Sequence, residues 1–308
     1  MEKIIIDTDI GIDDAFALRL GMLKQDLVGI TTVAGNVTAD MATRNAKLFC
    51  QHYGLNVPIC KGATRPLMEE PCEPITDVHG DDGLGGFYHE YFDSTTERNA
   101  VDFIISMAKA HPQELTLVAI GPLTNVALAL NLCPELAKLL KRLVIMGGAF
   151  GHHGHSGNMS NFAEFNINCD PEAAAQVFAS SLPTVIVPLD VTYEVLISGE
   201  EIAAVGDEFL TNISKHYLQF SFEEEGFYGM AVHDALTIVY LCHPELFTAK
   251  EGAVRVSLNG ITRGQTMQNP STMPVPDDCF KGYPAKQVLV DVEVNSVKDF
   301  IFRALKGA

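Results

Sequence analysis

Four aspartates lie within eight residues near the start of the chain, where the apolar segment Ile4-Ile5-Ile6 is followed by Asp7-Thr8-Asp9-Ile10-Gly11-Ile12-Asp13-Asp14. Carboxylates this close together repel one another unless protons or a cation neutralise them. A helix cap would explain Asp13 or Asp14 alone, but four acids together favour a metal site. Ligands that offer only oxygen indicate a hard cation, calcium or magnesium, rather than zinc.

Three later segments are polar where strands are expected to end. Asn36 follows the second apolar run, and Thr124 and Asn125 follow a later one. A third segment, Gly157 to Ile167, contains Asn158, Glu164 and Asn166. These segments contain no Lys or Arg, which favours a neutral, hydroxyl-rich ligand such as a sugar over a phosphorylated one. Met146, before Gly147-Gly148, could line the same pocket or simply fill the core.

Two histidines are candidates for contact with the ligand. His233 stands beside Asp234 at the start of a strongly apolar helix, where the pair could combine a proton donor with a metal ligand. His79 lies in a long loop that could close on a bound molecule. His152, His153 and His155 resemble a metal-binding tract, but a surface loop is the preferred interpretation.

Several known site types do not fit. Neither GxxxxGK[ST] nor a helix-opening GxGxxG is present, and the spacing around Gly11 does not match an EF-hand. A magnesium-dependent phosphatase with a nucleophilic aspartate on the first strand remains an alternative, although Gly11 stands where such enzymes usually carry Thr or Val. A non-catalytic protein that binds calcium or a sugar is a second alternative.

The expected elements alternate along the first half of the chain. Short apolar runs predict strands over 3–8, 27–34, 115–121, 142–146 and 184–189, with helices over 13–24, 38–53, 97–110, 124–132 and 170–179. The more helical second half has predicted helices over 200–205, 208–222, 232–242 and 297–305 and strands over 254–258 and 288–294. This order predicts an open, mostly parallel, Rossmann-like sheet flanked by helices. The acids at residues 7–14 would then lie at the carboxyl edge of the sheet, where such folds bind ligands.

Composition narrows the class of protein. No linker or repeat divides the 308 residues, so we expect one domain over 1–308. A net charge of −18 without a basic stripe disfavours nucleic acid and anionic membranes as partners. No signal peptide is recognisable, and no apolar run approaches the ~20 residues of a membrane span. Seven dispersed cysteines without zinc-like spacing favour reduced thiols and a cytoplasmic location.

Taken together, the motifs resemble those of the inosine-uridine type nucleoside hydrolases. The matching motifs are DxDxGxDDA, AGN after the second strand, GPLTN, MGG, AEFNI-xx-DPEAA and the late VHDA, and they follow the family order from residue 4 to residue 235. The segment Gly282-Tyr283-Pro284-Ala285 and the last strand and helix extend the resemblance over essentially the whole chain. One departure is Ile10, where the family usually has Pro. It should change the rigidity of the turn more than the chemistry.

The resemblance implies a set of roles for the site residues. Asp9, Asp14, Asp234 and the backbone carbonyl of Thr124 would hold one calcium ion, with Asp7 behind them. The residues expected to bind the ribose hydroxyls are Asp13, Asn36, Asn158, Glu164 and Asn166, and His233 would lie near the nucleobase. The family also implies a homodimer or homotetramer.

The implied reaction is hydrolysis of the N-glycosidic bond of ribonucleosides. The bond breaks through an oxocarbenium-like sugar, which nearby carboxylates favour. Asp9 would take a proton from water and His233 would protonate the departing nucleobase. The sequence leaves open whether purine or pyrimidine nucleosides are preferred, because that depends on loop side chains around 65–82 and 222–228.

Overall fold

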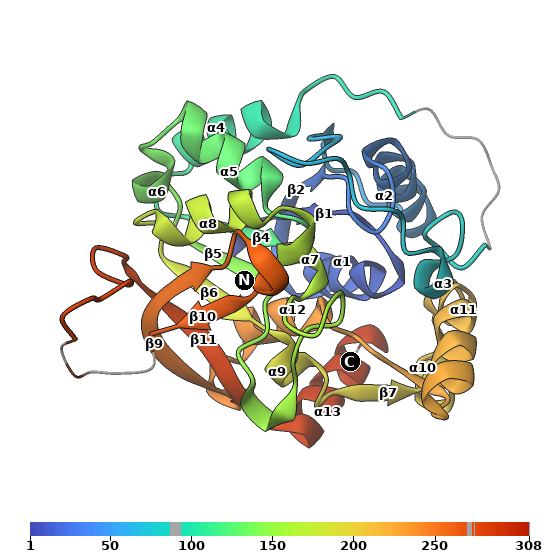
Figure 1. Ribbon diagram of the computed structural model, residues 1–308. Coiled ribbons are helices and arrows are strands. Elements are labelled where there is room, and N and C mark those ends of the chain that lie inside the picture. Colours follow the sequence, from blue (N-terminus) through green and yellow to red (C-terminus); the bar gives the residue numbers. More distant parts are fainter. Residues whose placement is uncertain (87–93, 270–272, 274, 308) are drawn as a thin grey trace.

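A computed structural model describes residues 1–86, 94–269, 273 and 275–307 (Figure 1). Nine of the described strands form one mixed sheet, in the order β10-β9-β11-β6-β5-β4-β1-β2-β3. These strands are β1 (Lys3–Thr8), β2 (Asp26–Thr32), β3 (Ile59–Lys61), β4 (Leu115–Ala119), β5 (Arg142–Met146), β6 (Thr184–Val187), β9 (Phe247–Val256), β10 (Thr266–Gln268) and β11 (Ala285–Val292). A separate pair is formed by β7 (Leu196–Ser198) and β8 (Gly229–Ala231).

Helices cover both faces of the sheet (Figure 1). The longer ones are α1 (Ile12–Lys24), α2 (Ala39–Tyr53), α4 (Ala100–Ala110), α5 (Thr124–Leu132), α8 (Pro171–Ala179), α11 (Glu208–Glu225), α12 (Ala235–Cys242) and α13 (Val294–Leu305). Short α-helical turns are α3 (Thr76–His79), α6 (Leu136–Leu139), α7 (Phe165–Cys169), α9 (Leu189–Thr192) and α10 (Gly199–Ala203), and 3-10 turns are η1 (His152–Gly154), η2 (Pro244–Leu246) and η3 (Gly260–Thr262). Among the described residues, no helix has both the length and the apolar composition needed to cross a bilayer.

Strands that follow β1 in the chain are added to the sheet first on one side of β1 and then on the other. On one side β1 pairs in parallel with β2, and β2 with β3. On the other side β1 pairs in parallel with β4, which leads on to β5 and β6. The chain therefore leaves the carboxyl end of β1 next to a topological switch point, the place where open α/β sheets bind ligands.

The central strands are apolar throughout because both of their faces are covered. Along β1, Ile4 and Ile6 enter a core that includes Phe16 of α1 and Leu236 of α12. Ile5 points to the opposite face and enters a second core with α4, α5 and α8. This alternation leaves no polar face on β1 until Asp7, and it brings the start of α1 close to the start of α12.

The predicted fold class is confirmed, and most predicted elements are present. Strands over 3–8 and 142–146 match β1 and β5 residue for residue. The predicted strand over 254–258 covers only the end of β9, because residues 248–251 are exposed and form no apolar run. The three-residue strands β3, β7, β8 and β10 were not predicted, since so short a segment shows no periodicity. The long loop that carries His79 contains the turn α3, and the polar segment Gly157 to Ile167 overlaps α7.

Candidate active site

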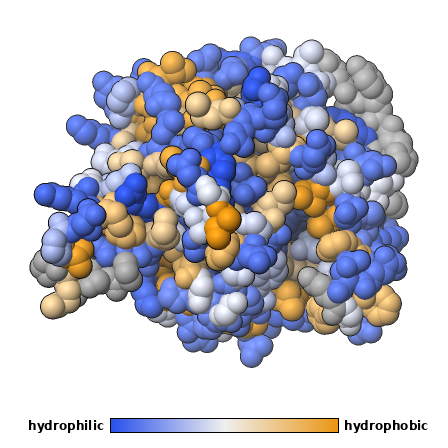
Figure 2. Space-filling view, in the orientation of Figure 1, coloured by the Kyte–Doolittle hydropathy of each residue, from blue (hydrophilic) through white to orange (hydrophobic). Residues whose placement is uncertain are grey.

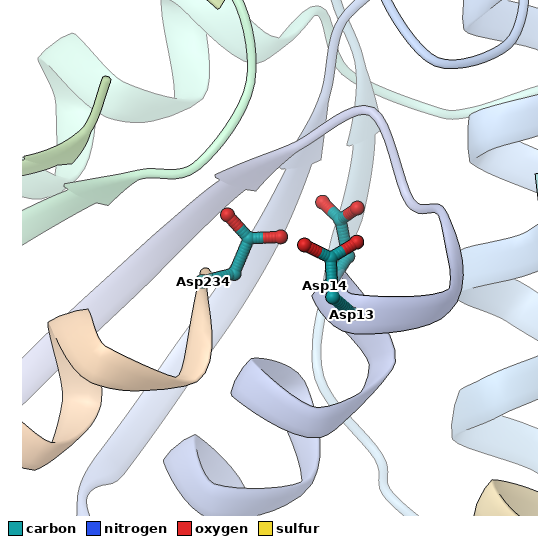
Figure 3. Close-up of side chains that lie close together, drawn as sticks. All are labelled: Asp13, Asp14 and Asp234. Atoms are coloured by element: carbon teal, nitrogen blue, oxygen red, sulfur yellow. The ribbon is translucent and has the colours of Figure 1, made fainter. Parts of the chain in front are cut away.

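Three buried carboxylates converge where α1 and α12 begin. Asp13 and Asp14 stand in the first turn of α1, and Asp234 directly precedes α12. One side-chain oxygen from each of the three lies within 4.8 Å of the others. Figure 3 shows the three carboxylates pointing toward one another from the two helices. The structure thus brings together two of the predicted metal ligands, Asp14 and Asp234, with Asp13, which was predicted to bind ribose.

Asp9 lies next to this cluster, in the turn after β1. Its Oδ2 atom accepts a hydrogen bond from the backbone N–H of Asn36 at 2.6 Å, whereas its Oδ1 atom is buried without a hydrogen-bond partner. Two glycines allow this position: a Cβ atom on Gly35 would lie 2.0 Å from Oδ2, and one on Gly121 would lie 2.8 Å from Oδ1. The loops after β2 and β4 therefore pack directly against the Asp9 carboxylate.

Asp14 has a second role as a helix cap. Its Oδ2 atom accepts the backbone N–H of Gly11 at 2.7 Å, and its Oδ1 atom accepts the hydroxyl of Thr8 at 2.5 Å. Asp14 therefore both caps α1 and belongs to the carboxylate cluster. The cap fixes the side chain while it contributes to the carboxylate cluster.

Burial, and then mutual repulsion, shift the pKa values of these acids upward. Burial and the charge of Asp14 raise the pKa of Asp13 to about 8. Burial is also the largest cause that raises the pKa of Asp9 and of Asp234 well above the ordinary range, followed by the neighbouring carboxylates. A hard divalent cation would relieve this repulsion and satisfy the unpartnered oxygen of Asp9, so the donor set fits such an ion.

The cluster borders a cavity of about 540 Å³. Nine of the predicted site residues line it: Asp13, Asn36, His79, Met146, Asn158, Glu164, Asn166, His233 and Asp234. Asp9 and Asp14 are fully buried beside it. None of the described residues that line the cavity is Lys or Arg. This composition suits an uncharged ligand with many hydroxyl groups and disfavours a phosphate.

Thr124 lies outside the cavity lining. It begins α5, and its hydroxyl donates to Asp170 at 2.7 Å. Its side chain faces a neighbouring cavity of about 370 Å³ that Cys72 also lines. The predicted metal contact involves its backbone carbonyl and stays a prediction.

One end of the cavity presents fixed polar groups to a ligand. Glu164 caps α7, where its Oε1 accepts the N–H of Asn166 at 2.8 Å and its Oε2 accepts that of Ile167 at 3.0 Å. The side-chain amide of Asn166 donates to the carbonyls of Ile120 and Met146, which leaves its buried Oδ1 atom without a partner. Asn158 accepts the N–H of Phe165 at 2.9 Å. The side chains are thus held in place before any ligand binds.

Both predicted histidines are buried and line the cavity. His79 accepts the backbone N–H of Ile12 through Nδ1 at 3.1 Å, which places its hydrogen on Nε2. Burial, followed by the charges of His233 and His216, lowers the pKa of His79 to about 3. Burial and the charge of His155 lower the pKa of His233 to about 4. Both imidazoles are therefore neutral near pH 7 in the free protein.

The cavity also has an aromatic wall. Tyr193, Tyr217 and Phe220 were not predicted, whereas Phe227 falls in the segment 222–228 expected to influence nucleobase preference; partly exposed Met159 and Leu196 also line the cavity. The surface of the molecule shows apolar patches within a largely hydrophilic face (Figure 2). His155 lies in a surface loop, as predicted, and it also lines the cavity, which was not predicted. Tyr193 could have been found from its place just after the strand at 184–187, the criterion that identified Asn36.

The geometry disfavours the phosphatase alternative. Asp7, the nucleophile in that reading, is fully buried and lies outside the cavity lining. Its Oδ1 atom accepts hydrogen bonds from Thr31 at 2.5 Å and Asn125 at 2.8 Å. A substrate in the cavity would not reach this carboxylate, which instead ties β1 to β2 and α5.

The chain is similar to known proteins along nearly its whole length. The profile of the inosine-uridine preferring nucleoside hydrolases matches residues 4–299. The chain is 35% identical over 311 residues to a probable uridine nucleosidase of Oryza sativa, which covers 97% of this chain and 95% of the relative. It is 36% identical over 310 residues to a non-specific ribonucleoside hydrolase of Escherichia coli, with 98% and 97% covered.

Solved structures agree with this comparison. A plant nucleoside hydrolase superposes with a TM-score of 0.94 at 34% identity, covering 100% of this chain and 99% of that one. A purine-preferring ribonucleoside hydrolase from Gardnerella vaginalis superposes with a TM-score of 0.89 at 30% identity, with 99% and 98% covered.

Proposed function

The chain belongs to the inosine-uridine preferring nucleoside hydrolase family and is a ribonucleoside hydrolase, and we propose that it works with calcium, with Asp9 activating water and His233 assisting the departing nucleobase. The observation that carries this proposal is the convergence of three buried carboxylates at a cavity whose described lining contains no Lys or Arg. That combination favours a cation beside the acids and a neutral, hydroxylated ligand.

The proposed metal ligands are the carboxylates of Asp9, Asp14 and Asp234 and the backbone carbonyl of Thr124. Oxygen-only donors favour calcium, which accepts six to eight ligands and so leaves positions for water and sugar hydroxyls. When bound, the ion supplies positive charge that makes a neighbouring water a stronger acid and orients the sugar.

Asp9 is the proposed general base. Its Oδ2 is held by the N–H of Asn36, and its buried Oδ1 has no hydrogen-bond partner in the protein, so we assign this oxygen to the contact with the cation and the water that the cation would hold. Proton transfer to a carboxylate whose pKa burial has raised is easier than to an ordinary, exposed one.

The ribose is proposed to bind at the polar end of the cavity. Asp13, Asn36, Asn158, Glu164 and Asn166 offer fixed acceptors and donors to its hydroxyls, and Met146 packs beside them. The carboxylates also favour the positive charge that develops on the sugar as the glycosidic bond breaks.

His233 is proposed to donate a proton to the nucleobase. Its Nδ1 atom lies 2.6 Å from the Thr192 hydroxyl, which can donate to that nitrogen. In the neutral imidazole the hydrogen then resides on Nε2, the nitrogen left to hydrogen-bond the nucleobase. To act as a general acid, His233 takes up a proton from solvent as the nucleoside binds; Nδ1–H then donates to the Thr192 hydroxyl, and Nε2–H is the proton given to the nucleobase. His79, whose hydrogen is on Nε2, would hydrogen-bond the ligand from the other side.

A substrate panel with controlled metal content tests this proposal. The purified protein, stripped with chelator and reloaded with calcium, is assayed for free ribose from inosine, guanosine, uridine, cytidine and their 2′-deoxy forms. We expect hydrolysis of ribonucleosides that chelation abolishes and calcium restores, together with bound calcium in elemental analysis. Full activity in excess chelator with no bound metal would overturn the calcium assignment. Release of phosphate from monoesters, without release of ribose from nucleosides, would overturn the assignment of ribonucleosides as substrates.

The proposal extends to assembly and location. A homodimer or homotetramer is proposed from family resemblance, and sedimentation equilibrium measures the mass of the assembly. A cytoplasmic location is proposed from the cysteines, all seven of which are free in the structure. Fractionation of cells expressing the tagged chain tests it.

A further inference from the structure

Three consecutive residues at the end of α9 contact two imidazoles. The hydroxyl of Thr192 lies 2.6 Å from Nδ1 of His233, and Oε1 of Glu194 lies 2.6 Å from Nε2 of His155. Between them, the ring of Tyr193 lies with its centroid 4.9 Å from that of His233 and 5.3 Å from that of His155. His155, Tyr193 and His233 therefore form a continuous row, and all three line the cavity.

The row begins at His233, the neighbour of Asp234 in the chain, and its other end, His155, is held by Glu194 in the turn after α9. If the ribose occupies the carboxylate end, a nucleobase that contacts His233 also reaches toward Tyr193 and His155. Tyr193 offers a ring face or edge to a planar nucleobase, and His155 offers a polar group.

We propose that His155, positioned by Glu194, is a second residue that binds the nucleobase and stabilises the negative charge it acquires as the glycosidic bond breaks. This inference rests on the proposed function, in which His233 faces the nucleobase. The bonding electron pair stays with the nucleobase, and His155 forms a hydrogen bond without a covalent step.

The hydrogen-bond geometry supports this role. A carboxylate can only accept, so Nε2 of His155 carries a hydrogen and is committed to Glu194. Nδ1 is then the nitrogen left for the ligand, as an acceptor in the neutral ring and as a donor in the protonated ring. To stabilise a developing negative charge, Nδ1 must act as a donor, which requires hydrogen on both ring nitrogens. A charged donor of this kind makes a stronger hydrogen bond to an electron-rich nucleobase than a neutral one does.

His155 is not required to hold its own loop. Asp190 accepts the backbone N–H groups of Phe150 and His152, and Nε2 of His153 contacts the carbonyl of Val290 at 2.9 Å. His153 is therefore a matched control: it is a histidine in the same loop, also has a hydrogen-bond partner, and lies outside the cavity lining.

The test compares leaving groups. In the calcium-loaded enzyme, kcat/KM is measured for inosine, uridine and a nitrophenyl riboside, whose leaving group needs no help. The variants are His155→Phe, Glu194→Gln, their combination, and His153→Phe; the phenylalanine at 155 retains packing on Tyr193. We expect His155→Phe to lower kcat/KM about 10- to 100-fold on both nucleosides, the cost of one hydrogen bond to a charged group, and less than about threefold on the nitrophenyl riboside.

The other variants complete the test. Glu194→Gln should show the same dependence on the leaving group, and the combined variant should be no worse than His155→Phe within about twofold, because the two residues act as one unit. Equal losses on all three substrates, or equal effects of His153→Phe and His155→Phe, would overturn the inference while leaving the proposed function intact. A wild-type enzyme that releases no ribose from any nucleoside would overturn both.

Discussion

The backbone N–H of Ile12 donates to Nδ1 of His79 at 3.1 Å, so the first turn of α1 fixes the imidazole carried by α3. Gly11 makes this contact possible, since a Cβ atom there would lie 2.6 Å from the same nitrogen. The helix that presents Asp13 and Asp14 to the carboxylate cluster therefore also sets the tautomer of a histidine that lines the cavity. A change at residues 10–12 would alter both.

The first prediction concerns stability in acid. Burial lowers the pKa of His79 from 6.5 to about 3, so between these values the unfolded chain holds a proton at this residue that the folded chain does not. Stability from neutral His79 is present above pH 6.5 and is lost as pH falls toward 3, by about 1.4 kcal/mol per pH unit. Urea unfolding of the wild type and His79→Gln from pH 7 to pH 4.5 measures the difference. The exposed His52→Gln is the control, and parallel curves for wild type and His79→Gln would contradict the prediction.

The second prediction uses the close packing of Gly35 on Asp9. Gly35→Ala places a Cβ atom 2.0 Å from Oδ2 of Asp9, which must move. We expect kcat/KM to fall by about 100-fold or more, because displacing a reacting group by 1 Å has effects of this size. Gly252→Ala is the control, since its Cβ meets only the flexible side chain of Gln268 at 3.1 Å. Full activity of Gly35→Ala with an unchanged melting temperature would show that the position of Asp9 is not critical.

The third prediction concerns His233 and the departing nucleobase. His233→Ala should lower kcat for inosine by about 10²–10⁴-fold, the usual contribution of a general acid. A nitrophenyl riboside should be affected far less, because its leaving group departs without a proton. Thr192→Val removes the hydroxyl next to Nδ1. It should lower kcat for inosine by a smaller factor and again affect the nitrophenyl riboside less. If both substrates lost activity equally, His233 would have a structural or sugar-binding role.

The fourth prediction is selectivity for the sugar. The buried Oδ1 atom of Asn166 has no partner, and Glu164 is held beside it by three backbone N–H groups. A site built around hydroxyl groups rejects analogues that lack one by ~10⁴-fold or more. We expect kcat/KM for uridine to be much higher than for deoxyuridine and for uridine monophosphate. In Asn166→Ala the ratio of kcat/KM for uridine to that for deoxyuridine should be smaller. A deoxyuridine value within about tenfold of uridine, ~1.4 kcal/mol, would contradict this assignment.

The part of the site on strand ends could be predicted from the sequence. Asp9, Asn36 and Met146 end or follow parallel strands, and such strands bring their carboxyl ends to one edge of a sheet. Apolar runs long enough to show their pattern located these strands. Asp234 was recognisable because it stands beside a histidine at the start of an apolar helix.

The aromatic part of the cavity depends on tertiary packing that the sequence does not specify. Tyr217 and Phe220 belong to α11, whose periodicity predicts a helix but not the element it faces. His155 reaches the cavity because Asp190 anchors its loop to α9 through two backbone N–H groups. Such contacts between a loop and a distant turn leave no periodic signal.

The three acids of the carboxylate cluster lie together in the folded protein but are synthesised at different times. Asp13 and Asp14 leave the ribosome early, whereas Asp234 emerges only after the strands from β1 to β6 have been synthesised. A nascent chain that ends before α12 contains β1 to β6 and Asn166, but it lacks one of the three acids. The completed cluster is thus a late product of synthesis, and truncated translation products that fold their first half do not carry it.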